Sequence, residues 1–384
     1  MSEQEIPLSR PDISVLEERL VLEVLRSGRL SIGPMLERFE SLVAQRSGCR
    51  HGVGVSSGTA GLHLVLEAIG VGPGDEVVTT PFSFVASSNA IEYVGARPVF
   101  VDIDPSSLNM DPNFVEKAIT EKTRAILAVE AFGNPKHMDT YAQIAARHDI
   151  PLIEDSCEAL GCTHNGQRAG SFGRAGVFGF YPNKQITTGE GGMIVTDDEH
   201  LADMCRSLRN HGRPVDGADS GSWLDHVRLG YNFRMSEVSA AIGVAQMQRF
   251  DEMTQRRQNV ARSYLDRLLS KRDLILPTVD PDTFLTWFVF VVRLETEYRQ
   301  DERDRILRGM RAHEIGVSNY FPCIHLLPYY RHRYGHAQGD FPIAESVSGR
   351  TIALPFHPGL SDRDIDLVVQ TLDLMIQREN LSRT

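Results

Sequence analysis

Residues 51–69, HGVGVSSGTAGLHLVLEAI, decide the fold class of this chain. The first five residues predict a buried strand, and the run LHLVLEAI after the turn has apolar residues at helical spacing. A turn from a strand into a helix presents free backbone N–H groups at the positive end of the helix dipole, where phosphate groups bind. The turn 56–61, SSGTAG, is therefore a candidate phosphate site, and an ordinary helix cap is the alternative.

The same order of strand and helix continues outward from this stretch to about residue 200. Short β-rich runs alternate with periodic stretches such as 59–69, 87–94 and 138–148. Alternation of this kind is typical of an α/β domain, in which helices cover both faces of a mostly parallel sheet. The strand-like runs are 53–55, 76–79, 98–103, 125–129, 151–154, 177–180 and 193–195.

The two ends of the chain have other patterns. Residues 14–28 and 36–42 predict helices, and 233–270 reads as one long helical region. After Pro277, a strand-like run over 285–294 is mixed with the helical segments 302–313 and 362–376, which predicts a smaller α+β domain. Since 384 residues exceed one ordinary core, we expect a large domain over residues 1–250 and a small C-terminal domain over 251–384.

Composition excludes several classes of function. The net charge of −11 argues against nucleic acid as the main partner. The five cysteines are scattered and form neither a disulfide framework nor a zinc pattern, so we expect no metal site. Because the N-terminus lacks the apolar core of a signal peptide and no run approaches the ~18 apolar residues of a membrane helix, we expect a cytoplasmic protein without a membrane partner.

Two further motifs carry chemistry. Residues 153–158, IEDSCE, follow an apolar run, and ligands of open α/β sheets bind at such strand ends. A solvated acidic turn is the alternative for Asp155. Residues 180–193, FYPNKQITTGEGGM, place Lys184 among glycines that would let a ligand approach closely. Most lysines are exposed, but a desolvated lysine is a nucleophile or a base.

Taken in order, these three motifs resemble the DegT/DnrJ/StrS family of sugar aminotransferases, within the aspartate aminotransferase superfamily. The resemblance covers nearly the whole chain. It includes SGRLSIGPMLERFE at 27–40, the run 71–104, SLRNHGR at 207–213, GYNFRMSEVSAAIGVAQM at 230–247, IHLLPYY at 324–330 and LPFHPGLSDRD at 354–364.

The resemblance implies a fold and an activity. The implied fold is type I of the pyridoxal 5'-phosphate (PLP) enzymes, with a mostly parallel seven-stranded sheet flanked by helices in the large domain and a smaller C-terminal α+β domain. The implied cofactor is PLP. The implied reaction moves an amino group from an amino acid, usually L-glutamate, to the keto group of a nucleotide-linked sugar, in a homodimer with shared active sites.

The resemblance also assigns roles to single residues. Lys184 matches the lysine that binds PLP covalently, and Asp155 matches the acid at the pyridine nitrogen. Phe84 matches the aromatic residue that stacks on the ring, with a core phenylalanine as the alternative. Asn232 matches a residue that reaches the phosphate of the neighbouring subunit's cofactor. The positions that match the phosphate site are Ser57, Gly58, Thr59 and Ala60.

Two positions depart from the family pattern. Gly179 stands where the family often has a serine whose hydroxyl would contact the phosphate, and the backbone or a water is the alternative source of that contact. Glu158 stands where many members have Gln or His near the phenolic oxygen of the cofactor, and a carboxylate beside a phenolate is unfavourable unless one of them is protonated.

Substrate contacts are expected on three loops, 28–34, 213–224 and 318–336. The candidate residues on the first and third loops are Ser31, Gly33, Tyr320 and His325. For His325 a structural hydrogen bond is the alternative, and the segment 209–211 either serves an anionic substrate or ends a helix.

Three other functions compete. A dehydratase of the same fold has histidine in place of the lysine, so Lys184 argues against it. A PLP-binding regulator without turnover would carry a DNA-binding module or a broken site, and neither is visible. An aminotransferase of a keto-cyclitol is the third alternative.

Overall fold

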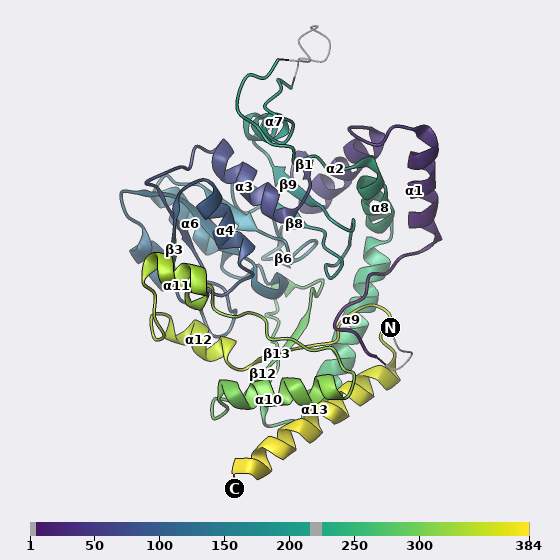
Figure 1. Cartoon of the computed structure of the whole chain (residues 1–384), viewed down its shortest axis with the longest axis vertical. Coiled ribbons are helices and arrows are strands. Elements are labelled where there is room, and N and C mark those ends of the chain that lie inside the picture. The colour runs from purple at the N-terminus through teal and green to yellow at the C-terminus, as the bar shows by residue number, and fades with distance from the viewer. Residues whose placement is uncertain (1–4, 216–224, 384) are drawn as a thin grey trace.

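The computed structural model describes residues 5–215 and 225–383. A seven-stranded sheet lies in the upper half of the molecule as drawn in Figure 1. Its strand order is β1-β9-β8-β5-β4-β2-β3. These strands are β1 (His51–Val55), β2 (Glu76–Thr79), β3 (Arg97–Phe100), β4 (Thr123–Val129), β5 (Leu152–Asp155), β8 (Ala175–Gly179) and β9 (Gly192–Thr196).

The strand directions bring most carboxyl ends to one edge of the sheet. From β8 to β3 all neighbours are parallel, whereas β9 is antiparallel to both β1 and β8. Strand β1 therefore runs in the same direction as β8, and every strand except β9 ends at the same edge. This arrangement confirms the mostly parallel seven-stranded sheet.

Helices cover both faces of this sheet, as the alternation of strands and helices predicts. Successive residues of a strand point to opposite faces. On β8, Val177 packs with α3 and α7, whereas Phe178 packs with α2 and α8 on the other face. The covering helices are α1 (Val15–Ser27), α2 (Pro34–Ser47), α3 (Gly58–Ala68), α4 (Ala86–Tyr93), α6 (Met138–Arg147), α7 (Glu199–Leu208) and α8 (Glu237–Gln248).

The N-terminal helices have clear start and stop signals. Helix α1 begins with a capping box between Ser14 and Glu17 and ends at Gly28, whose φ of 72° is left-handed. Helix α2 begins at Pro34, and its first N–H groups, together with that of Gly33, donate to the carboxylate of Glu237 at 2.9–3.0 Å. Glu237 is 1% exposed, so α8 fixes the start of α2.

The long helical region predicted over 233–270 is two helices. Helix α8 ends at Gln248, and α9 (Phe250–Leu268) follows after Arg249, whose φ of −102° and ψ of 6° interrupt the helix. Arg249 also forms ion pairs with Asp12 and Glu17. Contacts with the N-terminal segment thus accompany the break, and they carry no local sequence signal.

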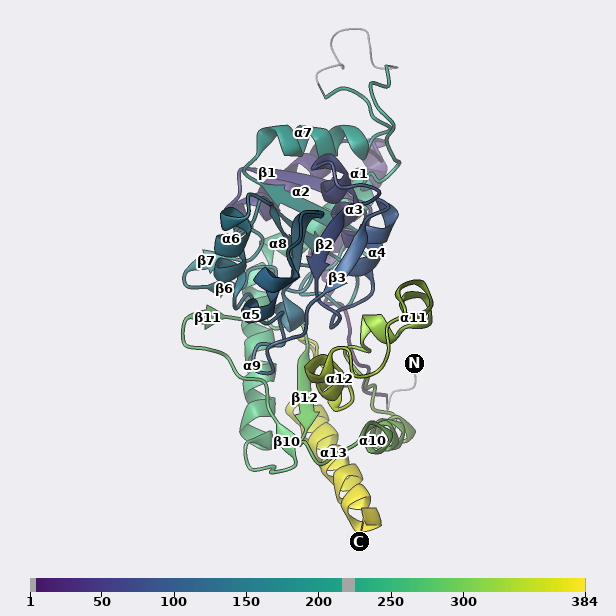
Figure 2. The ribbon, with the colours of Figure 1, turned by 90° about the vertical axis from the view of Figure 1, so that its left-hand side faces the viewer.

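The C-terminal part forms a separate small sheet with the order β10-β12-β13, packed against α9, α10 and α13 (Figure 2). The predicted strand over 285–294 is ordered as β12 only from Phe290, because Trp287 has a left-handed φ of 56°. The domain boundary at residue 250 stays a prediction. The elements here are β10 (Leu274–Ile275), β12 (Phe290–Leu294), α10 (Gln300–Ala312), β13 (Thr351–Leu354) and α13 (Asp362–Arg383).

Short elements complete the chain. A third sheet has the order β11-β6-β7 and joins residues after β5 to the segment before β12. The remaining α-helices and strands of the described residues are α5 (Pro112–Val115), β6 (Thr163–His164), β7 (Gln167–Arg168), β11 (Thr283–Phe284), α11 (Pro328–Tyr334) and α12 (Pro342–Ser348).

Candidate functional site

The three sequence motifs meet at the carboxyl edge of the large sheet. The turn 56–61 follows β1, the acidic segment follows β5, and the lysine segment follows β8. Close backbone packing joins them. A Cβ on Gly58 would lie 2.6 Å from the sulfur of Cys157 and 3.3 Å from the Cα of Gly179, so no other residue fits there without a shift. The candidate site therefore depends on strands that are far apart in sequence.

The start of α3 offers donors for an anion. Ser57 is the N-cap, and its Oγ accepts the N–H of Ala60 at 3.1 Å. The first N–H groups of a helix, here those of Gly58 and Thr59, have no partner within the helix. Gly192 of β9 packs directly behind this turn, where an added Cβ would be 2.5 Å from the carbonyl carbon of Ser57. The turn is thus tightly supported by β9.

Asp155 ends β5 and is 6% exposed. Its carboxylate accepts the hydroxyl of Ser87 at 2.6 Å and the N–H of Cys157 at 3.3 Å. In the part of the chain that the structure describes, no Lys, Arg or His forms an ion pair with it. A buried carboxylate without a cation is costly, and it is suited to bind a cationic or N–H group of a ligand.

Lys184 lies opposite Glu158. The lysine Nζ is 3.5 Å from Oε1 of Glu158, and the two side chains are 15% and 8% exposed. The other carboxylate oxygen, Oε2, accepts the N–H of Phe132 at 2.9 Å. Burial raises the pKa of Glu158, and the nearby ammonium of Lys184 partly opposes this rise. The pair thus places an amine and a carboxyl group of raised pKa side by side.

Two stacked aromatic rings, those of Phe288 and Tyr320, lie next to the amine of Lys184. The Nζ of Lys184 is 4.0 Å from the ring centroid of Phe288, and the ring of Tyr320 stacks on that of Phe288 at 6.5 Å and 10°. Arg257, which is 4% exposed, holds this arrangement from behind: its guanidinium donates to the carbonyls of Trp287 at 3.0 Å and Lys184 at 2.9 Å. Arg257 therefore links the backbone of Lys184 to the segment that carries Phe288.

Two predicted cofactor residues lie at the surface of the chain. Phe84 is 63% exposed just before α4, an unusual position for a large aromatic side chain, and it is not part of the core. Asn232 is also exposed, in an extended segment that pairs with Asn210. Both side chains can therefore meet a ligand or a second subunit.

The predicted substrate residues do not form one cluster. Ser31 is exposed and pairs with Ser236, and the N–H of Gly33 is used by Glu237. Tyr320 adjoins the lysine through Phe288. His325 is fully buried, and its Nε2 is 3.0 Å from Oε1 of Glu345. This geometry matches a structural hydrogen bond, which was the alternative to a substrate contact. Part of the loop 213–224 lies outside the described residues.

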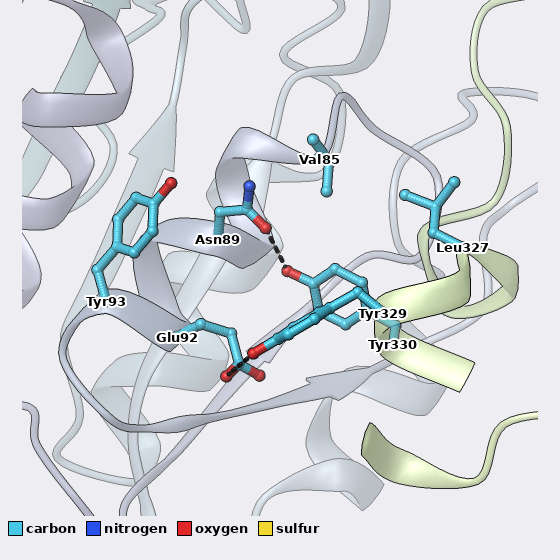
Figure 3. Close-up of a pocket in the computed structure, with 7 residues that line it drawn as sticks. All are labelled: Val85, Asn89, Glu92, Tyr93, Leu327, Tyr329 and Tyr330. Carbon is cyan, nitrogen blue, oxygen red and sulfur yellow. Dashed lines mark hydrogen bonds between the residues drawn. The ribbon is translucent and has the colours of Figure 1, made fainter. Parts of the chain in front are cut away.

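A surface pocket lies between α4 and α11, as Figure 3 shows. Tyr330 donates to Oδ1 of Asn89 at 2.7 Å, and Tyr329 donates to Glu92 at 3.1 Å. Both tyrosines belong to the IHLLPYY stretch at 324–330. These bonds attach that stretch to the helix that carries Ser87.

Sequence reasoning missed Ser87, Phe288 and Arg257. Ser87 lies in the helical pattern SSNAI, where a serine has no distinguishing feature, and Phe288 lies within an apolar run. Arg257 is one of several arginines on α9. Only the tertiary structure brings the three residues to Asp155 and Lys184.

The described residues contain no group of three or more His, Cys, Asp and Glu side chains arranged to hold a metal ion. Among the same residues, no helix is both long and apolar enough to span a bilayer. The candidate site contains an amine, two carboxyl groups, an exposed aromatic ring and the N–H groups of α3. This set suits a flat, aromatic ligand that carries a phosphate and reacts with an amine.

The chain has many relatives of known class. A sequence model of the DegT/DnrJ/EryC1/StrS aminotransferase family matches residues 11–373. The spore coat polysaccharide biosynthesis protein SpsC of Bacillus subtilis is 38% identical over 373 residues, which are 96% of this chain and 96% of SpsC.

Two solved structures have the same fold over nearly their whole length. Spr1654 of Streptococcus pneumoniae in its PLP form has a TM-score of 0.92 at 29% identity and covers 98% of this chain and 99% of its own, and its PMP form also matches. Helicobacter pylori PseC, an aminotransferase involved in the biosynthesis of pseudoaminic acid, has a TM-score of 0.91 at 26% identity and covers 97% and 100%.

Proposed function

Since the chain belongs to the DegT/DnrJ/EryC1/StrS aminotransferase family and is a PLP-dependent sugar aminotransferase, we propose that it transfers an amino group from L-glutamate to the keto group of a nucleotide-linked sugar. Lys184 and Asp155 are the catalytic residues of this proposal. The observation that carries it is the convergence of a nearly buried amine, an unpaired buried carboxylate and a free helix N-terminus at one sheet edge.

The residues of the site fit PLP. When bound, this cofactor supplies an aldehyde that reacts with amines and a pyridine ring that withdraws electrons from the reacting carbon. Asp155 would bind the ring nitrogen, which gives its buried charge a partner. Phe84 would stack on the ring. The start of α3, from Ser57 to Ala60, would bind the phosphate, without the hydroxyl that Gly179 lacks.

In this proposal Lys184 has two tasks. It would hold the cofactor covalently, and when its Nζ is free it would move a proton as general acid and base. Glu158 lies 3.5 Å from that nitrogen and can take up or return the proton, since its carboxyl pKa is raised. Phe288 and Arg257 keep the amine oriented while it is free.

Reduction with borohydride tests the role of Lys184. The cofactor-loaded protein is reduced, digested and mapped, and the label is expected on the peptide that contains YPNKQITTGEGG. Label on a different lysine would refute the assignment. The substrate is tested separately, by screening nucleotide-linked keto sugars and keto-cyclitols for their ability to take the amino group from the loaded enzyme.

A homodimer with shared sites is the second part of the proposal. Exposed Asn232 would reach the phosphate at the site of the other subunit. Mixing inactive Lys184→Ala with inactive Asn232→Ala chains should then restore some activity, because one of the two sites in a mixed dimer keeps both residues. Absence of recovery when subunit exchange is demonstrated would contradict a shared site.

A further inference from the structure

The segment 231–234, which carries Asn232, is fastened on both sides by backbone hydrogen bonds. On one side, the N–H of Phe233 donates to the carbonyl of Arg209, at the end of α7, at 3.0 Å. On the other side, the carbonyl of Phe233 accepts the N–H of Ser56 at 2.8 Å. Ser56 belongs to the turn that leads into α3, so the segment is bound directly to the candidate phosphate site of its own chain.

Side chains of this extended segment alternate between two directions. Tyr231 and Phe233 are part-buried, and their rings stack on each other at 4.9 Å and 11°. Both rings pack against His63 of α3, with centroids 4.8 Å and 5.9 Å from that of the imidazole. Successive side chains of an extended chain point to opposite sides. Because its two neighbours pack on α3, exposed Asn232 points away from the helix.

A hydrogen bond also holds Tyr231 on α3. Its hydroxyl donates to Oε2 of Glu67 at 2.6 Å, and Nε2 of His63, one turn earlier on the helix, is 3.5 Å from the same oxygen. Burial raises the pKa of Tyr231 to about 12, and the carboxylate of Glu67 adds to this rise, so the hydroxyl keeps its proton and remains a donor. Hydrogen bonds to charged groups are stronger than those between neutral groups.

Helix α3 therefore has two tasks. Its first turn offers N–H groups to the phosphate in its own subunit, and its next two turns hold the segment from which Asn232 is proposed to reach the phosphate in the other subunit. We propose that Tyr231, together with Glu67 and His63, is a positioning residue for the cofactor site of the other subunit, on which it acts by orienting Asn232. This inference rests on the proposed function with its shared sites.

Mixed dimers with one competent site test the assignment, because they separate the two subunits. Chains with different affinity tags are combined, and one chain of each dimer carries Lys184→Ala, so that the visible absorbance of lysine-bound PLP arises in the other chain. In the first dimer, Tyr231→Phe is on the Lys184→Ala chain, which supplies Asn232 to the competent site. In the second dimer, Tyr231→Phe is on the chain that holds the competent site.

The affinity of the competent site for PLP is read from the absorbance as the cofactor is added. We expect the first dimer to bind PLP about three- to tenfold more weakly, since the loss of a charge-assisted hydrogen bond is felt only in part at a neighbouring residue. The second dimer should bind PLP like a dimer that carries Lys184→Ala alone. Unchanged affinity in the first dimer, or an equal loss in the second, would overturn the proposal.

Two controls distinguish positioning from a general structural effect. Tyr231→Phe keeps the stacked ring, and thermal unfolding verifies that the variant is folded. Tyr298→Phe removes a hydroxyl that donates to the carboxylate of Asp273 at 2.6 Å, next to the small sheet, and should leave PLP affinity unchanged.

The second control places Asn232→Ala on the same chain as Tyr231→Phe. If Tyr231 acts through Asn232, Tyr231→Phe should cause no further loss once Asn232 is replaced, because the two changes then remove the same contact. A further loss in this double variant would contradict the assignment.

Failure of the proposed function gives other results. If Lys184 does not bind the cofactor, the unmodified protein lacks the visible absorbance. If the sites are not shared, Asn232→Ala on the Lys184→Ala chain leaves the competent site unaffected. Should the absorbance form and Asn232→Ala act across the dimer while Tyr231→Phe does not, only the positioning role of Tyr231 is wrong.

Discussion

Replacing Asp155 by Asn removes one negative charge from the candidate site and keeps the size of the side chain. Asp155 is 6% exposed, and the hydroxyl of Ser87 at 2.6 Å can donate to an amide oxygen as well as to a carboxylate. No described cation pairs with Asp155, so the cofactor-free protein loses no ion pair. We therefore expect its unfolding free energy to change by less than about 1 kcal/mol.

The reaction should respond much more strongly. If Asp155 pairs with the protonated ring nitrogen of PLP, loss of one partner of a buried pair costs about 3–5 kcal/mol. Where that interaction is present in the transition state, the loss corresponds to roughly a 10²- to 10⁴-fold slower reaction. We thus expect a much slower reaction with an almost unchanged unfolding free energy. If Asp155 only formed a solvated acidic turn, the rate would not change either.

The assay combines single-turnover amine transfer from glutamate with thermal unfolding of the cofactor-free protein. The control is Asp251→Asn, at a side chain 85% exposed whose ion pair with Arg46 is on the surface. Exposed pairs contribute about 0.2–1 kcal/mol, and the rate of the control should be unchanged. A folded, cofactor-loaded Asp155→Asn protein with a near-normal rate would show that another group binds the ring nitrogen.

Three further changes test the surroundings of the site. Ser87→Ala removes the hydroxyl that donates to buried Asp155, and should lower the unfolding free energy of the cofactor-free protein by about 1.5–3 kcal/mol in urea; a loss under about 0.5 kcal/mol would contradict this contact. Burial raises the pKa of Glu130 well above its usual value of 4.5. Above pH 4.5 the carboxyl of Glu130 therefore keeps its proton in the folded protein and loses it in the unfolded chain, so the unfolding free energy falls as the pH rises. Glu130→Gln should flatten that decline when urea unfolding is compared at several pH values, and an unchanged slope would refute it. Gly192→Ala puts a Cβ 2.5 Å from the backbone of Ser57 and should weaken PLP binding by about 1–3 kcal/mol in a fluorescence titration, whereas undiminished affinity would show that the turn can shift freely.

Local patterns were sufficient to predict the strands of the large sheet. Runs such as 125–129 and 193–195 are rich in apolar and β-branched residues, and they lie within β4 and β9. The turn 56–61 could also be located, because glycine and hydroxyl residues between a strand and a helix favour a turn with a helix cap. The family resemblance then supplied the cofactor and the class of reaction, and the comparisons confirm both.

Contacts between distant segments could not be predicted in the same way. Glu237 binds the start of α2 from a position about 200 residues later, and nothing in the local sequence of α8 marks that glutamate. The left-handed φ of Trp287 shortens β12, although the sequence around it reads as a continuous strand. Arg249 interrupts a helical pattern without a glycine or proline. In each case tertiary packing overrides local propensity.

The position of β1 at the edge of the sheet has a consequence for how the chain acquires its structure. Within the seven-stranded sheet of the described residues, the neighbour of β1 is β9, in a register that joins His51 to Thr196, so β1 cannot enter the sheet until the ribosome has delivered β9. Closing so long a loop is slow, since its entropy is lost before any contact forms. The turn at Ser57 is backed by Gly192 of that same late strand. A nascent or refolding chain should therefore gain most of its helix first and take up PLP last, which makes cofactor uptake a kinetic marker of the completed sheet.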